Sequence, residues 1–97
     1  MECYNDAIRI NQNDDNAYNR MGFLCKYEKR LEDAIKFYDK AININPKSSL
    51  YYVNKGNVLF DLERKEEAMR CYNEAIMINP NDENAYNRLW FLLKTEK

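Results

Sequence analysis

Polar and apolar residues alternate along most of the chain with the period of an α-helix. The apolar side chains stand three or four positions apart, which gathers them on one face of a helix and leaves the opposite face polar. This pattern occupies residues 15–28, 31–44, 50–62 and 65–78. It therefore predicts an all-helical protein whose helices come in pairs with short connections.

Turn and capping signals separate the pairs. Asn-Pro dipeptides at 45–46 and 79–80 end them, because proline disfavours the helical conformation in the residue before it. Asp14, Ser48 and Asp82 stand at equivalent positions just before the helix that follows. A carboxylate or hydroxyl there can accept from the free N–H groups of the first turn. We expect these three side chains to cap helices and not to belong to an active site.

The helical pattern repeats every 34 residues. The segment "YDKAININP" begins at Tyr38 and "YNEAIMINP" at Tyr72, 34 positions later, while "YNDAIRINQ" begins 34 positions earlier at Tyr4. The pentapeptide "NAYNR" occurs at 16–20 and again at 84–88, which is twice that interval. The chain is therefore predicted to be an array of helical hairpins.

The ends of the chain fall in the middle of a repeat. Residues 1–10 match the second helix of a unit, and residues 83–96 match a first helix. We expect one array over 1–97 with about six helices. Its parts are a partial repeat with its second helix at 1–12, full repeats at 15–46 and 49–80, and the first helix of a partial repeat at 83–97.

A 34-residue period with W-x2-L-G-x2-Y, then A-x3-F, then P, is the tetratricopeptide (TPR) signature, and both complete units resemble it. The first does so through Tyr18, Met21, Gly22, Cys25, Ala34, Tyr38, Ala41 and Pro46. The second does so through Tyr52, Gly56, Leu59, Ala68, Tyr72, Ala75 and Pro80. The partial units match through Tyr4, Ala7, Tyr86, Leu89 and Leu93. The resemblance implies an α-solenoid of antiparallel helix pairs wound into a right-handed superhelix.

The chain departs from the TPR pattern at five positions. Lys55 stands where the family usually has leucine, Lys29 and Glu63 where a glycine commonly ends the first helix, and Gln12 where a proline separates units. Trp90 occupies the slot that is glycine in both complete units. A tryptophan there would clash with a tightly packed second helix, so we expect the third unit to pack differently or to pack against nothing.

Composition and charge exclude several functional classes. The composition, with 45% hydrophobic and 32% charged residues, is typical of an ordered protein. The net charge of −1 provides no overall positive field that would attract nucleic acid or an anionic membrane. Its longest apolar run, 89–93, is far shorter than the roughly 20 residues of a membrane span. The N-terminus lacks the features of a signal peptide. We expect a soluble, intracellular, cytoplasmic protein that binds neither nucleic acid nor membrane.

Catalytic and metal-binding patterns are missing. The chain has no histidine, no Gly-rich phosphate loop and no zinc spacing. Cys3, Cys25 and Cys71 fall inside apolar patterns, which favours buried thiols in a reducing compartment over a redox or metal role. The carboxylate pairs at 14–15, 32–33 and 66–67 complement helix dipoles, and a calcium site there is the weaker alternative. We expect no enzymatic activity, no cofactor and no metal.

The resemblance also implies where a ligand would bind, because in TPR proteins the first helices line the concave face of the superhelix. The corresponding positions are Asn16, Asn19, Arg20, Phe23, Lys26, Tyr27, Leu50, Val53, Asn54, Asn57, Phe60, Asp61, Asn84, Asn87, Arg88, Phe91, Lys94 and Thr95. Four of them are cationic and one, Asp61, is acidic, a local charge of +3 from 4 − 1. This surface predicts a protein partner that supplies an extended, acidic peptide to a scaffold or adaptor module. The alternative is that the asparagines serve the scaffold and the phenylalanines serve packing.

Many relatives hold the terminal carboxylate of chaperone tails with a clamp of five side chains. Asn54 and Arg88 match this clamp, but Asn19, Phe23 and Asn84 replace its other members. We therefore expect chaperone tails to bind weakly or not at all.

A different hypothesis starts from the unpaired terminal helices. Each would expose an apolar face of the size that usually finds a partner, roughly 300–600 Å². The last helix of one molecule and the first helix of another could rebuild a unit, giving a homo-oligomer by head-to-tail stacking or by domain swapping. The residues predicted for this contact are Leu89, Trp90 and Leu93 on one side and Tyr4, Ala7 and Ile8 on the other.

Overall fold

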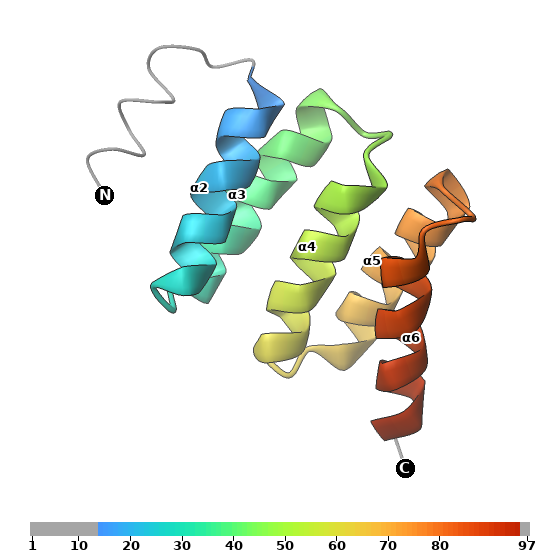
Figure 1. Cartoon of the computed structure of the whole chain (residues 1–97). Coiled ribbons are helices and arrows are strands. Elements are labelled where there is room, and N and C mark those ends of the chain that lie inside the picture. The colour runs from blue at the N-terminus through green and yellow to red at the C-terminus, as the bar shows by residue number, and fades with distance from the viewer. Residues whose placement is uncertain (1–13, 96–97) are drawn as a thin grey trace.

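The computed structural model describes residues 14–95, and every regular element in that range is a helix. The helices are α2 (Asp15–Tyr27), α3 (Leu31–Ile44), α4 (Ser49–Asp61), α5 (Lys65–Ile78) and α6 (Glu83–Thr95), as Figure 1 shows. The all-helical prediction is confirmed. The additional helix expected at residues 1–10 lies outside the described residues.

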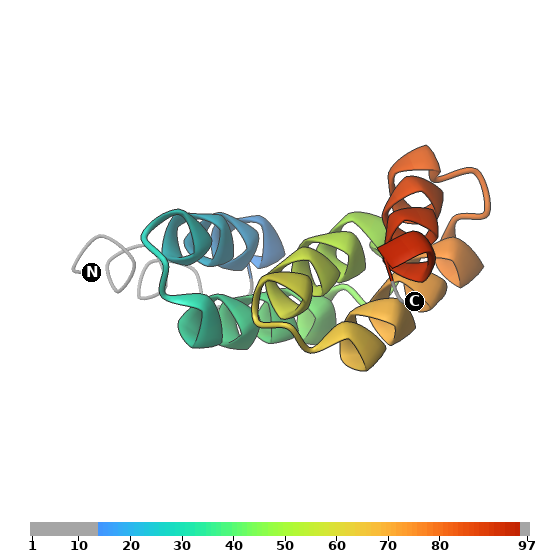
Figure 2. The ribbon, with the colours of Figure 1, turned by 90° about the horizontal axis from the view of Figure 1, so that it is seen from below.

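The helices are arranged in two layers. Helices α2, α4 and α6 form one layer, and α3 and α5 form the other (Figure 2). Each helix packs mainly against the helices that precede and follow it, with weaker contacts between successive members of the first layer. This one-dimensional stacking of antiparallel pairs is the predicted α-solenoid.

Two glycines allow the helices of each pair to approach closely. A Cβ atom on Gly22 would lie 2.5 Å from Cε1 of Tyr38, and one on Gly56 would lie 2.6 Å from Cε1 of Tyr72. Each tyrosine ring therefore lies directly on the backbone of the partner helix. A small residue at the close approach and a large aromatic residue between the layers thus occur together at both sites.

The hydrophobic core is divided among successive clusters along the array. One cluster joins α2, α3 and α4 around Met21, Cys25 and Tyr38. Another joins α4, α5 and α6 around Leu59 and Tyr72. Because no single centre holds the chain together, the two halves of the array depend largely on different contacts, with Ile35 packed against both clusters.

Side chains cap two of the three predicted helix starts. Asp14 Oδ1 accepts from the N–H of Ala17 at 3.2 Å, and Asp82 Oδ1 accepts from the N–H of Ala85 at 3.2 Å. Ser48 has the extended backbone of a cap residue, but its hydroxyl accepts no such bond. The prediction is therefore wrong for Ser48, where the backbone turns into α4 without a side-chain cap.

The first helix of each pair ends in a left-handed residue that is not glycine. Lys29 has φ 67° and Glu63 has φ 62°. After α2, the N–H of Arg30 donates to the carbonyl of Cys25 at 2.7 Å, and the N–H of Lys29 donates to the carbonyl of Lys26 at 3.0 Å. These paired bonds form a Schellman motif. They explain why a glycine is common at this position in the TPR pattern.

Replacing Lys29 or Glu63 by glycine should stabilise the chain. The left-handed conformation costs a side-chain-bearing residue about 1 kcal/mol or more and costs glycine almost nothing. We expect each substitution to raise the free energy of unfolding by about 1 kcal/mol, measured by urea titration. The control Lys36→Gly, within α3, should lower it by about 1 kcal/mol. A loss of stability at position 29 and at position 63 would contradict the assignment of these caps.

A charged residue at one departure from the TPR pattern has a partner on the neighbouring repeat. Lys55 of α4 places its Nζ 2.6 Å from Oδ1 of Asp39 on α3. The Lys55 side chain is 26% exposed, so its alkyl part packs on the protein while its ammonium group reaches the protein surface. The lysine is accommodated because the preceding repeat supplies a carboxylate at this position.

Candidate functional site

The predicted groove residues lie on α2, α4 and α6, the three helices that share one layer (Figure 2). Most of their side chains are exposed or half-buried, as a ligand surface requires. Val53 is the exception, because it retains only 5% of its exposure and packs in the core cluster of α4, α5 and α6. Val53 is therefore a core residue. Its place among the predicted groove positions is wrong.

Side chains of this layer also contact one another directly across neighbouring helices. Asn54 Nδ2 on α4 donates to Asn19 Oδ1 on α2 at 2.9 Å. The rings of Phe60 on α4 and Phe91 on α6 meet edge to face, with their centroids 5.9 Å apart. Residues from all three repeats are thus brought together on one surface, and part of their bonding capacity is used to hold neighbouring helices in place.

A hydroxyl that the sequence reading did not single out links the first two repeats. The Tyr51 hydroxyl donates to Asp15 Oδ2 at 2.7 Å and lies 3.2 Å from Asn16 Oδ1. Asn45 Nδ2 also donates to Asp15 Oδ2, at 3.3 Å. The sequence feature that could have indicated this contact is that Tyr51 stands at a position that is alanine in the other two repeats. Asn16, predicted as a ligand group, is therefore partly engaged by the fold.

The second repeat has a comparable bond within one helix pair. The hydroxyl of Tyr72 donates to Asn57 Oδ1 at 2.7 Å. Burial raises the pKa of Tyr72 to about 12, so the phenol remains protonated and able to donate. Asn57, another predicted ligand residue, thus has its carbonyl oxygen engaged by the fold, while its amide N–H groups are not part of that bond.

The Tyr51–Asp15 bond should make stability depend on acid pH. It lowers the pKa of Asp15 below the ordinary value of 3.8, so the folded state favours the carboxylate. This contribution is present above pH 3.8 and is lost as the pH falls through the lower folded-state pKa. We expect Tyr51→Phe to cost about 1 kcal/mol at neutral pH. Urea titrations should show this difference shrinking in strong acid, and a difference independent of pH would contradict the bond.

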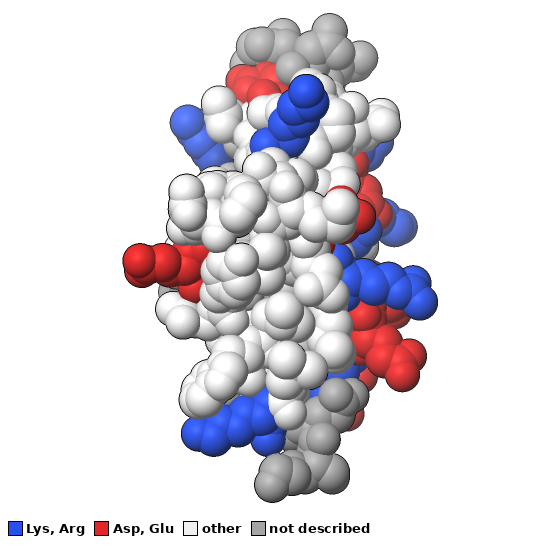
Figure 3. Space-filling model, turned by 90° about the vertical axis from the view of Figure 1, so that its right-hand side faces the viewer, with Lys and Arg blue, Asp and Glu red and all other residues white. Residues whose placement is uncertain are grey.

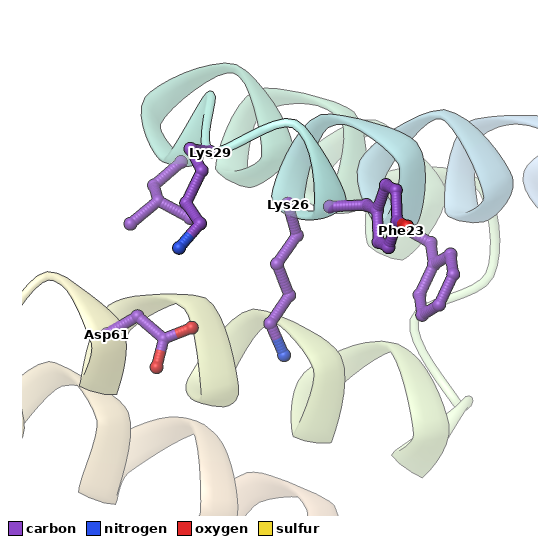
Figure 4. A pocket seen from close by; sticks show the side chains of 6 residues that line it. Phe23, Lys26, Lys29 and Asp61 are labelled. Atoms are coloured by element: carbon purple, nitrogen blue, oxygen red, sulfur yellow. The ribbon is translucent and has the colours of Figure 1, made fainter.

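Two hollows lie between α2 and α4, on either side of Phe23. The first, of about 620 Å³, is lined by Phe23, Lys26, Tyr27, Lys29, Leu31 and Asp61. In Figure 4, Lys26 extends from α2 toward α4, and Lys29 and Asp61 face the same space. The second, of about 350 Å³, is lined by Asn19, Arg20, Phe23, Leu24 and Asn54. Together they give the groove an apolar floor beside cationic side chains.

The cations of the groove have no carboxylate partner in the part of the chain that the structure describes. Arg20, Lys26 and Arg88 take part in none of the ion pairs of residues 14–95, which involve Arg30, Lys55 and Arg64. Lys26 shares its hollow with Asp61 without forming an ion pair, so all three cations can still pair with the carboxylates of a ligand.

The described residues contain no cluster of three or more potential metal ligands. Cys25 and Cys71 are buried and reduced, and burial raises the pKa of the Cys71 thiol to about 11. The remaining cysteine, Cys3, lies outside the described residues. No helix of residues 14–95 is long and apolar enough to cross a membrane.

Comparison with known families decides what this array is. Residues 16–48 and 49–82 each match the tetratricopeptide repeat family, and together they cover more than half of the chain. The chain belongs to the tetratricopeptide repeat family. No curated protein matches it significantly in sequence.

Solved TPR structures share its fold. The first TPR of Spaghetti (RPAP3) bound to the HSP90 peptide SRMEEVD superposes with a TM-score of 0.88 at 20% identity, covering 96% of this chain and 74% of that one. The first TPR domain of human RPAP3 gives 0.89 at 20% identity, covering 96% and 73%. YrrB, a TPR protein with an unusual peptide-binding site, gives 0.84 at 26% identity, covering 94% and 47%. The chain thus spans about three quarters of the RPAP3 domain and about half of YrrB.

The last TPR helix has an exposed, uncharged face. Trp90 is 62% exposed and Leu93 is 52% exposed, while Leu89 is half-buried against α4 and α5. Figure 3 shows a broad surface without charge at this end, with charged side chains along its edges. The opposing residues predicted for self-association, Tyr4, Ala7 and Ile8, lie outside the described residues.

Trp90 constrains what can cover this face. It occupies the position of Gly22 and Gly56, on which the Tyr38 and Tyr72 rings lie directly. Lys94 Nζ lies 4.7 Å from the centre of the Trp90 ring and covers part of it. A helix with a tyrosine at the equivalent position could not pack on α6 at the spacing of the two complete TPR units, because the indole would occupy the place of the phenol.

Proposed function

We propose that this TPR array is a non-catalytic protein-interaction module that binds an extended acidic peptide along α2, α4 and α6 as part of a scaffold or adaptor. The observation that supports it most directly is the set of cations without carboxylate partners beside the hollows around Phe23. An extended backbone can use the amides of the groove asparagines, while its acidic side chains meet the cations.

The comparison structures support the acidic character of the ligand. The HSP90 peptide held by the first TPR of Spaghetti, SRMEEVD, carries three acidic side chains and one basic side chain. The present chain keeps only Asn54 and Arg88 of the five-residue clamp described above. We therefore propose that its peptide is held along the groove through side-chain carboxylates, and that chaperone tails are poor ligands.

The test is a titration of the 97-residue chain with fluorescein-labelled, glutamate-rich peptides, followed by fluorescence anisotropy. We expect binding that weakens at least tenfold when Arg20 and Arg88 are both replaced by glutamate, a loss of about 1.4 kcal/mol. The matched control is Arg70→Glu on α5, in the other layer, which should leave the affinity unchanged. Equal losses for the control and the groove variant would show a general charge effect and overturn the proposal.

A separate titration addresses chaperone tails. A peptide ending in EEVD should bind much more weakly than the best glutamate-rich peptide. Low-micromolar binding of the EEVD peptide, measured by calorimetry, would contradict our proposal that this groove lacks the five-residue carboxylate clamp.

The uncharged α6 face favours a second candidate, self-association of the chain. Light scattering after size exclusion, from about 5 µM to about 500 µM, would show a molar mass that rises with concentration. Trp90→Ala should reduce that rise, and an unchanged association state would exclude this face. Since Trp90 opposes packing in the regular repeat spacing, we propose that any such contact uses a different spacing.

We also propose an intracellular location, since Cys25 and Cys71 are buried thiols in the structure and form no disulfide with each other.

A further inference from the structure

The groove surface repeats every two units and not every unit. Five groove positions of α2 are identical to the equivalent positions of α6, 68 residues later. They are Asn16, Asn19, Arg20, Phe23 and Lys26 on α2, and Asn84, Asn87, Arg88, Phe91 and Lys94 on α6. The equivalent residues of α4 are Leu50, Val53, Asn54, Asn57 and Phe60, and all five differ.

The groove positions of α2 and α6 stay identical even in the second half of the helices, where the packing positions of the two helices differ. In the second half of the helix, Met21, Gly22 and Cys25 of α2 become leucine, tryptophan and leucine in α6. Phe23 and Lys26 lie between and beside these positions and are retained. The chemistry facing the groove is thus the same on the two outer helices although the packing beneath it is not.

The middle helix presents a different surface. At the position of Arg20 and Arg88 it has Asn54, whose amide already donates to Asn19. At the position of Lys26 and Lys94 it has Phe60, which packs on Phe91. Asp61, the acidic residue of the groove, is also on this helix and lines the larger hollow. The groove is therefore cationic at its two outer helices and apolar, with one negative charge, between them.

The spacing of the two cationic sites follows from helix packing. Adjacent packed helices lie about 8–10 Å apart, so α2 and α6, with α4 between them, are separated by about 20 Å. An extended peptide advances about 3.3 Å per residue, and about six residues bridge that distance.

We propose that the ligand of this groove is an extended peptide with two acidic side chains about six residues apart and an uncharged, partly apolar segment between them. One carboxylate meets Arg20 on α2, and the other meets Arg88 on α6. The intervening segment lies over Phe60, where an additional acidic residue would face the carboxylate of Asp61. This inference rests on the proposed function and specifies the ligand of that same groove.

The experiment uses labelled peptides in a serine background with one leucine at the centre. Their two glutamates stand from about two to about ten residues apart, and a reference peptide has a single glutamate. Anisotropy titrations of the whole 97-residue chain should give the tightest binding near six residues, at least tenfold tighter than the reference. A third glutamate at the centre should weaken that binding severalfold.

Variants test the two sites separately. Arg20→Ala and Arg88→Ala should each bring the two-glutamate peptide close to the affinity of the single-glutamate peptide, and Arg→Lys at either position should retain most of it. Arg70→Ala on α5 is the control and should have no effect, with circular dichroism melts showing that all variants are folded.

The outcomes separate this inference from the proposed function. Binding that does not depend on glutamate spacing, or that survives the loss of one arginine, would overturn the two-site ligand and leave an acidic-peptide groove standing. If no glutamate peptide of any spacing binds, both proposals fail.

Discussion

Replacing Tyr72 by alanine should cost about 3–5 kcal/mol, a large part of the stability of a chain this small. The Tyr72 side chain is 2% exposed and lies against the backbone of α4 at Gly56. Removing it leaves a cavity at the close approach of α4 and α5, and the packed helix backbones limit how far the site can collapse. Urea denaturation followed by circular dichroism would measure the loss.

Tyr72→Phe is the matched control because it keeps the ring and removes only the hydroxyl. It breaks the bond to Asn57 Oδ1 and should cost about 1 kcal/mol. If the alanine and phenylalanine variants were equally unstable, the hydroxyl and not the ring would hold this helix pair together, contrary to the packing described above.

Replacing Gly56 by alanine should also destabilise the chain, although alanine is the better helix former. The added Cβ would lie 2.6 Å from Cε1 of the Tyr72 ring, and that ring is buried and hydrogen-bonded through its hydroxyl. The propensity gain of about 1 kcal/mol is opposed by an overpacking cost of about 1–3 kcal/mol. We expect a net loss of up to about 2 kcal/mol in urea titrations.

The same position in the third repeat provides the contrast. Trp90→Ala introduces the same residue on an exposed face, where it loses the contact with Lys94, worth about 0.5 kcal/mol at an exposed site, and gains helix propensity. We expect little net change in stability. A stabilising Gly56→Ala, or a Trp90→Ala as damaging as Gly56→Ala, would show that the close approach is not what selects glycine.

The sequence predicted the architecture well because the repeat is a packing code. A 34-residue period specifies which residues are small, which are large and where each helix ends, and every copy adds independent support. The family match confirms the assignment, and the helices begin and end within a residue or two of the expected positions. Even Lys29 and Glu63, which broke the pattern, have the left-handed backbone that a glycine there would adopt.

The candidate site was less predictable because its side chains also bond to one another. Val53 has the phase of a groove residue but is buried where α4 meets its neighbours. Tyr51 and its bond to Asp15 depend on two repeats at once, and a repeat read as a single unit does not show them. The 34-residue period therefore predicts the packing within a repeat better than the contacts between neighbouring repeats.

Because the core is divided into clusters, local opening of the two parts of the array can be followed at two buried thiols. Cys25 is fully buried in the cluster of the first complete repeat, and Cys71 is 7% exposed in the cluster that α6 completes. A thiol reagent can modify each one only when its own part of the array opens, because such reagents need an exposed thiolate. The alkylation rates of Cys25 and Cys71 would therefore report separately on local opening at the two ends of the array. A ligand that spans α2 to α6 should slow both rates.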